Sequence, residues 1–128
     1  MDVITCHLNA DFDALASMAA AKKYYPDATL VFSGSQEKSV RDFLSSPHVA
    51  LEFRKVREIN LDDVTRLILV DVRNPERIGR FYFELIFDRH VKVIYVMGFE
   101  IINISKLGVY YAVCSDESSS STQLIFIL

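Results

Sequence analysis

The sequence has few cysteines and contains no long apolar run and no dense basic run. Cys6 and Cys114 lie far apart inside apolar segments and lack zinc-site spacing, so we expect reduced core residues of a cytoplasmic protein. The 14 Lys and Arg residues are dispersed along a chain of net charge −3, so composition gives no nucleic-acid footprint. No apolar run approaches the roughly 18 to 20 residues that cross a bilayer, and Asp2 and His7 interrupt the apolar start. We therefore expect a soluble protein without a signal peptide or a membrane partner.

The 128 residues, 51% of them hydrophobic, are enough to form one domain with a hydrophobic core. We expect this domain to comprise residues 1–128. Short apolar runs alternate with segments of helical period, which predicts an α/β fold: a mostly parallel sheet of about five strands with helices on both faces. Strands are predicted at residues 3–6, 29–32, 67–70, 91–95 and 109–113, and helices at 14–25, at 36–44, from Pro75 onward and at 122–128. The last predicted helix stops while it is still apolar, so we expect the chain to be a fragment of a longer polypeptide.

Acidic and imidazole side chains gather at the predicted strand ends. His7, Asp11 and Asp13 lie in the loop after the first strand, and Asp71 ends the buried run at 67–70. Parallel strands bring such loops to one edge of the sheet. Crowded carboxylates repel one another unless a dication neutralises them, and mixed imidazole and carboxylate ligands suit manganese, magnesium, iron or zinc. The alternative is structural: Asp13 as a helix N-cap, Asp11 as a solvated loop residue and His7 as a hydrogen-bonded loop histidine.

Three arginines, Arg73, Arg77 and Arg80, follow Asp71 along the chain. Guanidinium groups bind phosphate oxygens well, so these side chains are candidate contacts for the phosphate of a substrate. They could equally decorate the solvent face of a helix, which is the commoner fate of such residues. Both interpretations stay open at the level of sequence.

The pattern H-x-N-x-D-x-D-A, from His7 to Ala14, resembles the first motif of the DHH phosphoesterases, a family of exonucleases, family II pyrophosphatases and oligonucleotide or cyclic-dinucleotide hydrolases. Asp71 in "LILVDVR" is similar to the second motif. The stretches "DFDALAS", "SGSQEKSVRDFL" and "VDVRNPERIGRF" resemble one branch in particular. That branch is the amino-terminal DHH module of bacterial proteins that also carry CBS domains and a tRNA nucleotidyltransferase or poly(A) polymerase domain.

The resemblance implies two metal sites, of which only the first has a complete set of ligands in this sequence. One would be held by His7, Asp11 and Asp71, and a second by Asp13, Asp71, a histidine of the third motif and a later aspartate. The third motif is absent, because "VMG" at 96–98 follows the strand where Asp-His-His belongs. A degenerate relative, a truncated chain or a wrongly assigned sequence would each explain this departure.

Two functions follow from the resemblance. The first is a phosphoesterase that uses manganese or magnesium, with Asp13 and Asp71 in catalytic roles, acting on a phosphodiester or phosphoanhydride in a small molecule or a single-stranded nucleic acid. With the third motif missing, we expect slow hydrolysis or none. The alternative is a catalytically degenerate module that binds a ligand or docks against other domains of a nucleotidyltransferase-type protein. An aromatic cluster that reads as exposed fits such docking: Phe81, Tyr82, Phe83 and Phe87.

Overall fold

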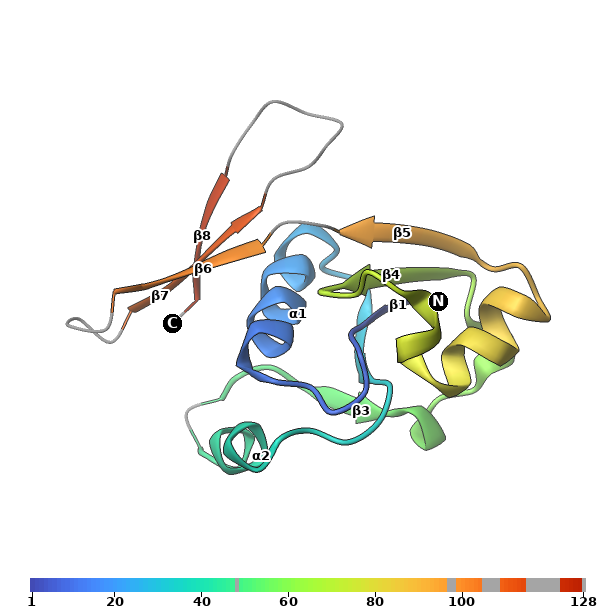
Figure 1. Ribbon diagram of the computed structural model, residues 1–128, viewed down its shortest axis with the longest axis horizontal. Coiled ribbons are helices and arrows are strands. Elements are labelled where there is room, and N and C mark those ends of the chain that lie inside the picture. The colour runs from blue at the N-terminus through green and yellow to red at the C-terminus, as the bar shows by residue number, and fades with distance from the viewer. Residues whose placement is uncertain (48, 97–98, 105–108, 115–122, 128) are drawn as a thin grey trace.

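The computed structural model describes residues 1–47, 49–96, 99–104, 109–114 and 123–127, with side chains described as far as residue 96. Its main element is a five-stranded sheet in which every pairing is parallel. The spatial order is β3-β2-β1-β4-β5 (Figure 1). The strands are β1 (Asp2–Thr5), β2 (Thr29–Phe32), β3 (Phe53–Lys55), β4 (Arg66–Val70) and β5 (Lys92–Val96). The predicted α/β fold with a parallel sheet is confirmed.

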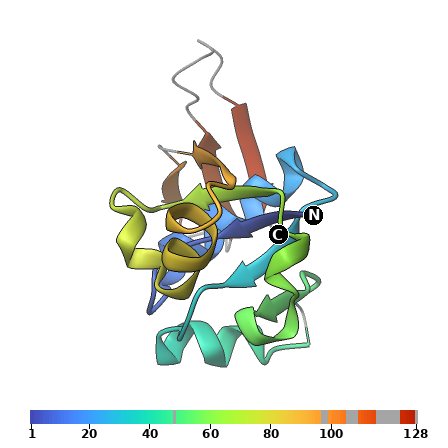
Figure 2. The same cartoon turned by 90° about the vertical axis from the view of Figure 1, so that its right-hand side faces the viewer.

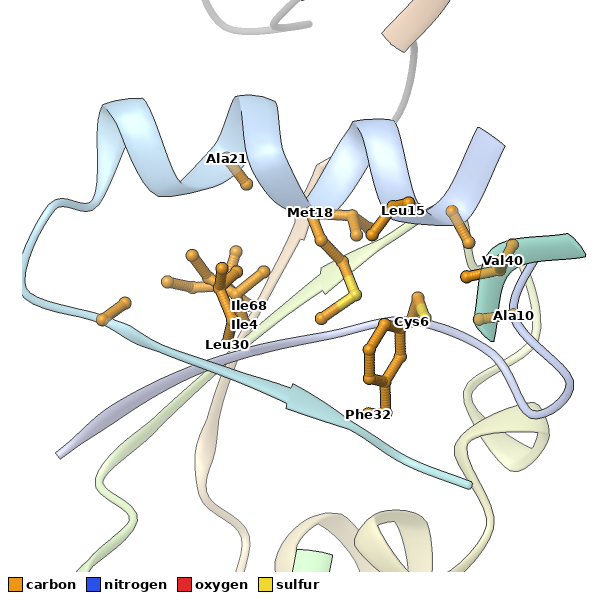
Figure 3. Packing of buried hydrophobic residues seen from close by; sticks show 13 residues of the cluster. Ile4, Cys6, Ala10, Leu15, Met18, Ala21, Leu30, Phe32, Val40 and Ile68 are labelled. Atoms are coloured by element: carbon orange, nitrogen blue, oxygen red, sulfur yellow. The ribbon is translucent and has the colours of Figure 1, made fainter. Parts of the chain in front are cut away.

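Two α-helices cover one face of this sheet. Helix α1 (Phe12–Tyr24) is rich in alanine, whose small side chain lets the helix approach the strands closely, and α2 (Lys38–Leu44) adds Val40 to the same core. Figure 3 shows Met18 of α1 directed toward the sheet, between Ile4 and Leu30 on one side and Phe32 on the other. Among the described residues, no helix has the length and apolar character needed to cross a membrane.

The opposite face is covered by short helical segments. These are three 3-10 turns, η1 (Val56–Glu58), η2 (Leu61–Asp63) and η3 (Pro75–Ile78), and one π-helical segment, η4 (Tyr82–Phe87). Ile78, Phe81 and Leu85 are fully buried against Leu67 and Leu69. Segments η3 and η4 lie on the side of the sheet away from α1 (Figure 2). The helix expected from Pro75 is thus two short pieces, and Phe81, which was expected to be exposed, is buried. Helical segments do cover both faces.

Two expectations for the end of the chain are wrong. Residues 109–113 do not join the parallel sheet, because β7 (Val109–Cys114) pairs antiparallel with β6 (Phe99–Ile104) and with β8 (Gln123–Ile127) in a separate sheet. The helix expected at 122–128 is replaced by β8. Short apolar runs do not distinguish a buried strand from a buried helix by periodicity, which is how the error arose. The fifth parallel strand is β3, a short edge strand that sequence analysis missed.

The strand order creates a switch point between β1 and β4. The chain moves outward from β1 to β2 and β3, and then returns to place β4 on the other side of β1. Thr5 of β1 lies beside Leu69 of β4, so the loops after these two strands begin side by side at the carboxyl edge. In open α/β sheets, ligands bind in the crevice at this kind of position.

Candidate metal site at the carboxyl edge of the sheet

The loop after β1 is held from two sides. On one side the Leu8 amide donates to the Arg77 carbonyl at 2.9 Å, which connects the loop to η3. On the other side Ala10 forms an isolated parallel bridge with Gln36, and the Glu37 amide donates to the Ala10 carbonyl at 2.9 Å. Ala10 is fully buried and lies next to Val40 of α2 (Figure 3). The backbone that carries His7 and Asp11 is therefore fixed relative to both flanking helical segments.

His7, Asp11 and Asp71 converge at this edge. The His7 Nε2 atom lies 3.8 Å from Asp11 Oδ1 and 3.5 Å from Asp71 Oδ2, and one ligand atom from each residue lies within 4.8 Å of the others. The His7 Nδ1 atom is 2.8 Å from the Leu8 carbonyl oxygen, so it carries the proton that is donated there. In the neutral ring this leaves the Nε2 lone pair facing the two carboxylates, as metal-ligating histidines require.

Asp11 has a second role as the N-cap of α1. Its Oδ1 atom accepts a hydrogen bond from the Ala14 amide at 2.9 Å, and its carboxylate lies at the positive end of the helix dipole. The helix therefore begins at Phe12, two residues before the predicted start, and the suggested capping role of Asp13 is wrong. Asp13 is exposed in the first turn and is outside the group of three. Its charge nevertheless acts on Asp71.

Asp71 stands in an unfavourable electrostatic and backbone environment. Partial burial raises the pKa of its carboxyl group, the negative charge of Asp11 raises that pKa further, and His7 opposes both effects. Its φ angle is +53°, in the left-handed region that few residues other than glycine adopt, and Asn9 in the facing loop has a φ of +56°. Such conformations persist only where the surrounding structure enforces them, and they concentrate at functional sites.

Cys6 precedes the site and is a core residue, as expected. Burial and the charges of Asp71 and Asp11 raise the pKa of its thiol to about 12, so the thiol stays protonated at neutral pH. A protonated thiol is neither a nucleophile nor a metal ligand. The side chain of Cys114 lies outside the part of the chain whose side chains are described.

The three candidate arginines differ in their surroundings. All are exposed, and the guanidinium group of Arg80 is paired with the Glu84 carboxylate one helical turn away. Within the described residues, Arg73 and Arg77 form no ion pair, so both are free to contact an anion. Their role as phosphate contacts stays a prediction, and Arg80 is the least available of the three.

The position of the missing third motif is described in part. Val96 ends β5 beside Val70 and packs on the core cluster formed with α1, whereas Met97 and Gly98 lie outside the described residues. The valine at 96 therefore adds an apolar group at this edge of the sheet. It supplies no ligand to the site.

Two glycines that sequence analysis did not single out shape the site. A Cβ atom on Gly34 would come within 2.5 Å of Leu8 Cδ2, and one on Gly79, whose φ is +58°, within 3.2 Å. Both glycines lie in loops at the carboxyl edge and leave room for the Leu8 side chain, which lies between them. A glycine two residues after the predicted strand at 29–32 was the available signal for the first of these contacts.

The strand order and the acidic cluster together define a doubly wound α/β domain with candidate ligands at its switch point. The A-adding tRNA nucleotidyltransferase of Geobacter sulfurreducens is 60% identical to this chain over 82 residues, which is 63% of the chain and 9% of that protein. The chain thus spans only a small part of the length of this relative. No protein-family model matches the chain, and no solved structure matches it.

Proposed function

We propose that this chain is an α/β module of a tRNA nucleotidyltransferase-type protein, and that it binds one manganese or magnesium ion together with a phosphate group. The observation that carries the proposal is the convergence of His7 Nε2 with the carboxylates of Asp11 and Asp71 at the switch point. The similarity to an A-adding tRNA nucleotidyltransferase supports the type of parent protein. This function corresponds to the ligand-binding alternative from the sequence.

The donor set fits a divalent cation. Two carboxylates and one imidazole carry two negative charges in the deprotonated state in which such groups coordinate a metal. The two aspartate side chains are each about 40% exposed, so a bound ion would keep positions open toward solvent for a phosphate oxygen or water. Arg73 and Arg77 supply positive charge on the chain that follows Asp71. When bound, the ion would contribute charge that attracts a phosphate and acidifies a coordinated water.

Hydrolysis of a phosphate ester is the second candidate function, as the resemblance to the DHH phosphoesterases implies. The charge of Asp13 raises the pKa of Asp71, and this coupling favours hydrolysis because these two residues would share the second ion of that family. The residues Val96, Met97 and Gly98 stand in the sequence where the family's Asp-His-His motif would supply the histidine of that ion, so we expect the chain to hydrolyse pyrophosphate, short oligonucleotides and cyclic dinucleotides slowly or not at all. Brisk turnover with manganese that disappears in Asp13→Ala would contradict this expectation.

Calorimetric titration of the full chain with manganese tests the ion site. We expect saturable binding that is lost in Asp71→Asn, which removes one charge while keeping a residue type that tolerates positive φ. The matched control is Asp27→Asn, an exposed aspartate before β2 at the opposite edge of the sheet. Equal manganese binding by Asp71→Asn and the parent chain would refute the site.

A further inference from the structure

Leu8 places an apolar side chain at the polar edge of the sheet. It directly follows His7 in the loop after β1, and 43% of it is exposed. Cβ atoms on Gly34 and Gly79 would come within 2.5 Å and 3.2 Å of its Cδ2 atom. The Leu8 side chain is thus packed against two loops at once, although nearly half of it faces solvent.

The backbone of Leu8 connects η3 to the imidazole ring of His7. The Leu8 amide donates to the Arg77 carbonyl at 2.9 Å, and the His7 Nδ1 atom donates to the Leu8 carbonyl oxygen at 2.8 Å. Among the described residues, no backbone amide donates to this carbonyl. A displacement of the Leu8 carbonyl would therefore act directly on the orientation of the imidazole.

The packing of the Leu8 side chain is the restraint that holds this carbonyl. The next residue, Asn9, is exposed with a φ of +56°, and no backbone hydrogen bond engages it in the part of the chain that the structure describes. The loop is fixed again at Ala10, whose amide donates to the Ser35 carbonyl at 3.0 Å. Between these two anchored amides, the contact of Leu8 with the two glycines fixes the chain.

We propose that Leu8 is a positioning residue for the His7 ligand, a role that rests on the proposed ion site. Its side chain fixes the carbonyl that accepts the Nδ1 proton, which leaves the Nε2 lone pair facing Asp11 and Asp71. The hydrogen bond made by one ring nitrogen decides which nitrogen is left for a metal. Partners that orient a ligating histidine typically contribute roughly 10- to 100-fold to metal affinity.

Calorimetric titration of the full chain with manganese measures this contribution. We expect Leu8→Ala to bind manganese about tenfold more weakly than the parent chain, and Leu8→Met, which conserves the volume, to bind nearly as well as the parent. Leu8→Val lacks the Cδ atoms that reach the glycines and should also bind weakly, in case the alanine variant folds poorly. The matched control is Leu61→Ala, which truncates a partly buried leucine of η2 at the amino edge of the sheet. Unchanged affinity in Leu8→Ala, or an equal loss in Leu61→Ala, would overturn the role.

The tautomer of His7 tests the same role without a metal. Proton–nitrogen NMR spectra at mildly alkaline pH, where histidine side chains are neutral, distinguish the Nδ1–H form from the Nε2–H form. The signals of His7 are identified by their loss in His7→Gln. We expect the Nδ1–H form in the parent chain, in Leu8→Met and in Leu61→Ala, and a shift toward the Nε2–H form in Leu8→Ala.

The two measurements separate this proposal from the ion site itself. An Nδ1–H imidazole that persists in Leu8→Ala would overturn the positioning role even where the parent chain binds manganese. A parent chain that binds no manganese would overturn the proposed ion site, and the spectra of the Leu8 variants would still decide whether this side chain sets the tautomer of His7.

Discussion

Asp11 performs two tasks that substitution can separate, because its carboxylate caps α1 and also faces His7. Asn caps helices about as well as Asp, whereas Ala does not, and the loss of a cap costs about 1 kcal/mol. For a chain of this length that cost corresponds to a melting temperature lower by about 4 °C. We therefore expect Asp11→Ala to melt earlier than the parent chain in the absence of metal.

Asp11→Asn should leave the metal-free stability nearly unchanged. Removing the charge forfeits an interaction with the helix dipole of about 0.5 kcal/mol, and it relieves a repulsion with the half-exposed Asp71 carboxylate of similar size. The two effects have opposite signs and nearly cancel. Any difference between Asp11→Asn and Asp11→Ala in EDTA thus measures the cap.

Melting the same variants in the presence of manganese tests the ligand role of Asp11. An ion present at a hundred times its dissociation constant stabilises the folded state by about 2.7 kcal/mol, or about 10 °C for this chain. We expect differential scanning calorimetry to show this increase for the parent chain and for Asp27→Asn, and no increase for Asp11→Asn or Asp11→Ala. A full manganese response in Asp11→Asn would refute the ligand role, and identical metal-free melting of the Asn and Ala variants would refute the capping role.

Further predictions concern Asp71 and the two glycines that contact Leu8. Since the pKa of Asp71 is raised, we expect calorimetry of the parent chain to show that manganese affinity starts to fall with decreasing pH earlier than an ordinary aspartate would cause, and a fall that starts only in the ordinary aspartate range would contradict this. By the same shift, any stabilising contribution of Asp71 to the metal-free fold is fully present below its ordinary pKa and is lost as pH rises through the raised value. Gly79→Ala should cost about 1 kcal/mol or more in a denaturant titration, because φ is +58° there. Gly34→Ala should cost less, since only the flexible end of Leu8 has to move, and an equal cost would contradict this reasoning.

The sequence predicted the central strands of the sheet and the position of the loops that follow them. The run at 67–70 was predicted to be a buried strand, and the structure confirms it: Leu67 and Leu69 are buried toward η3 and η4, and Ile68 and Val70 are buried toward α1. The prediction that the loops after β1 and β4 share one edge is also confirmed. It succeeded because only parallel strands bring both carboxyl ends together.

The failures have identifiable physical causes. Strand β3 was missed because Phe53–Lys55 is short and polar at an edge, where no apolar run is required. The aromatic cluster was predicted to be exposed, but Phe81 is fully buried while Phe83 and Phe87 are 61% and 66% exposed. Composition does not reveal which side of a helical segment meets the sheet. The capping role of Asp11 was assigned to Asp13 because both aspartates precede the apolar part of α1, and the boundary between them depends on tertiary contacts.

A purely structural interpretation of the acidic cluster accounts for Asp11 but does not account for Asp71. Asp11 caps a helix, and this role alone justifies a carboxylate at that position. Asp71 caps no helix, adopts a positive φ, and has a pKa raised by burial and by the neighbouring charge of Asp11. Its sole ion-pair partner among the described side chains is His7, at 3.5 Å. A carboxylate kept under these conditions destabilises the metal-free fold, and a cation between Asp71 and Asp11 would reverse the sign of that contribution. The unfavourable environment of Asp71 therefore adds to the convergence of His7, Asp11 and Asp71 as an argument for an ion at this edge of the sheet.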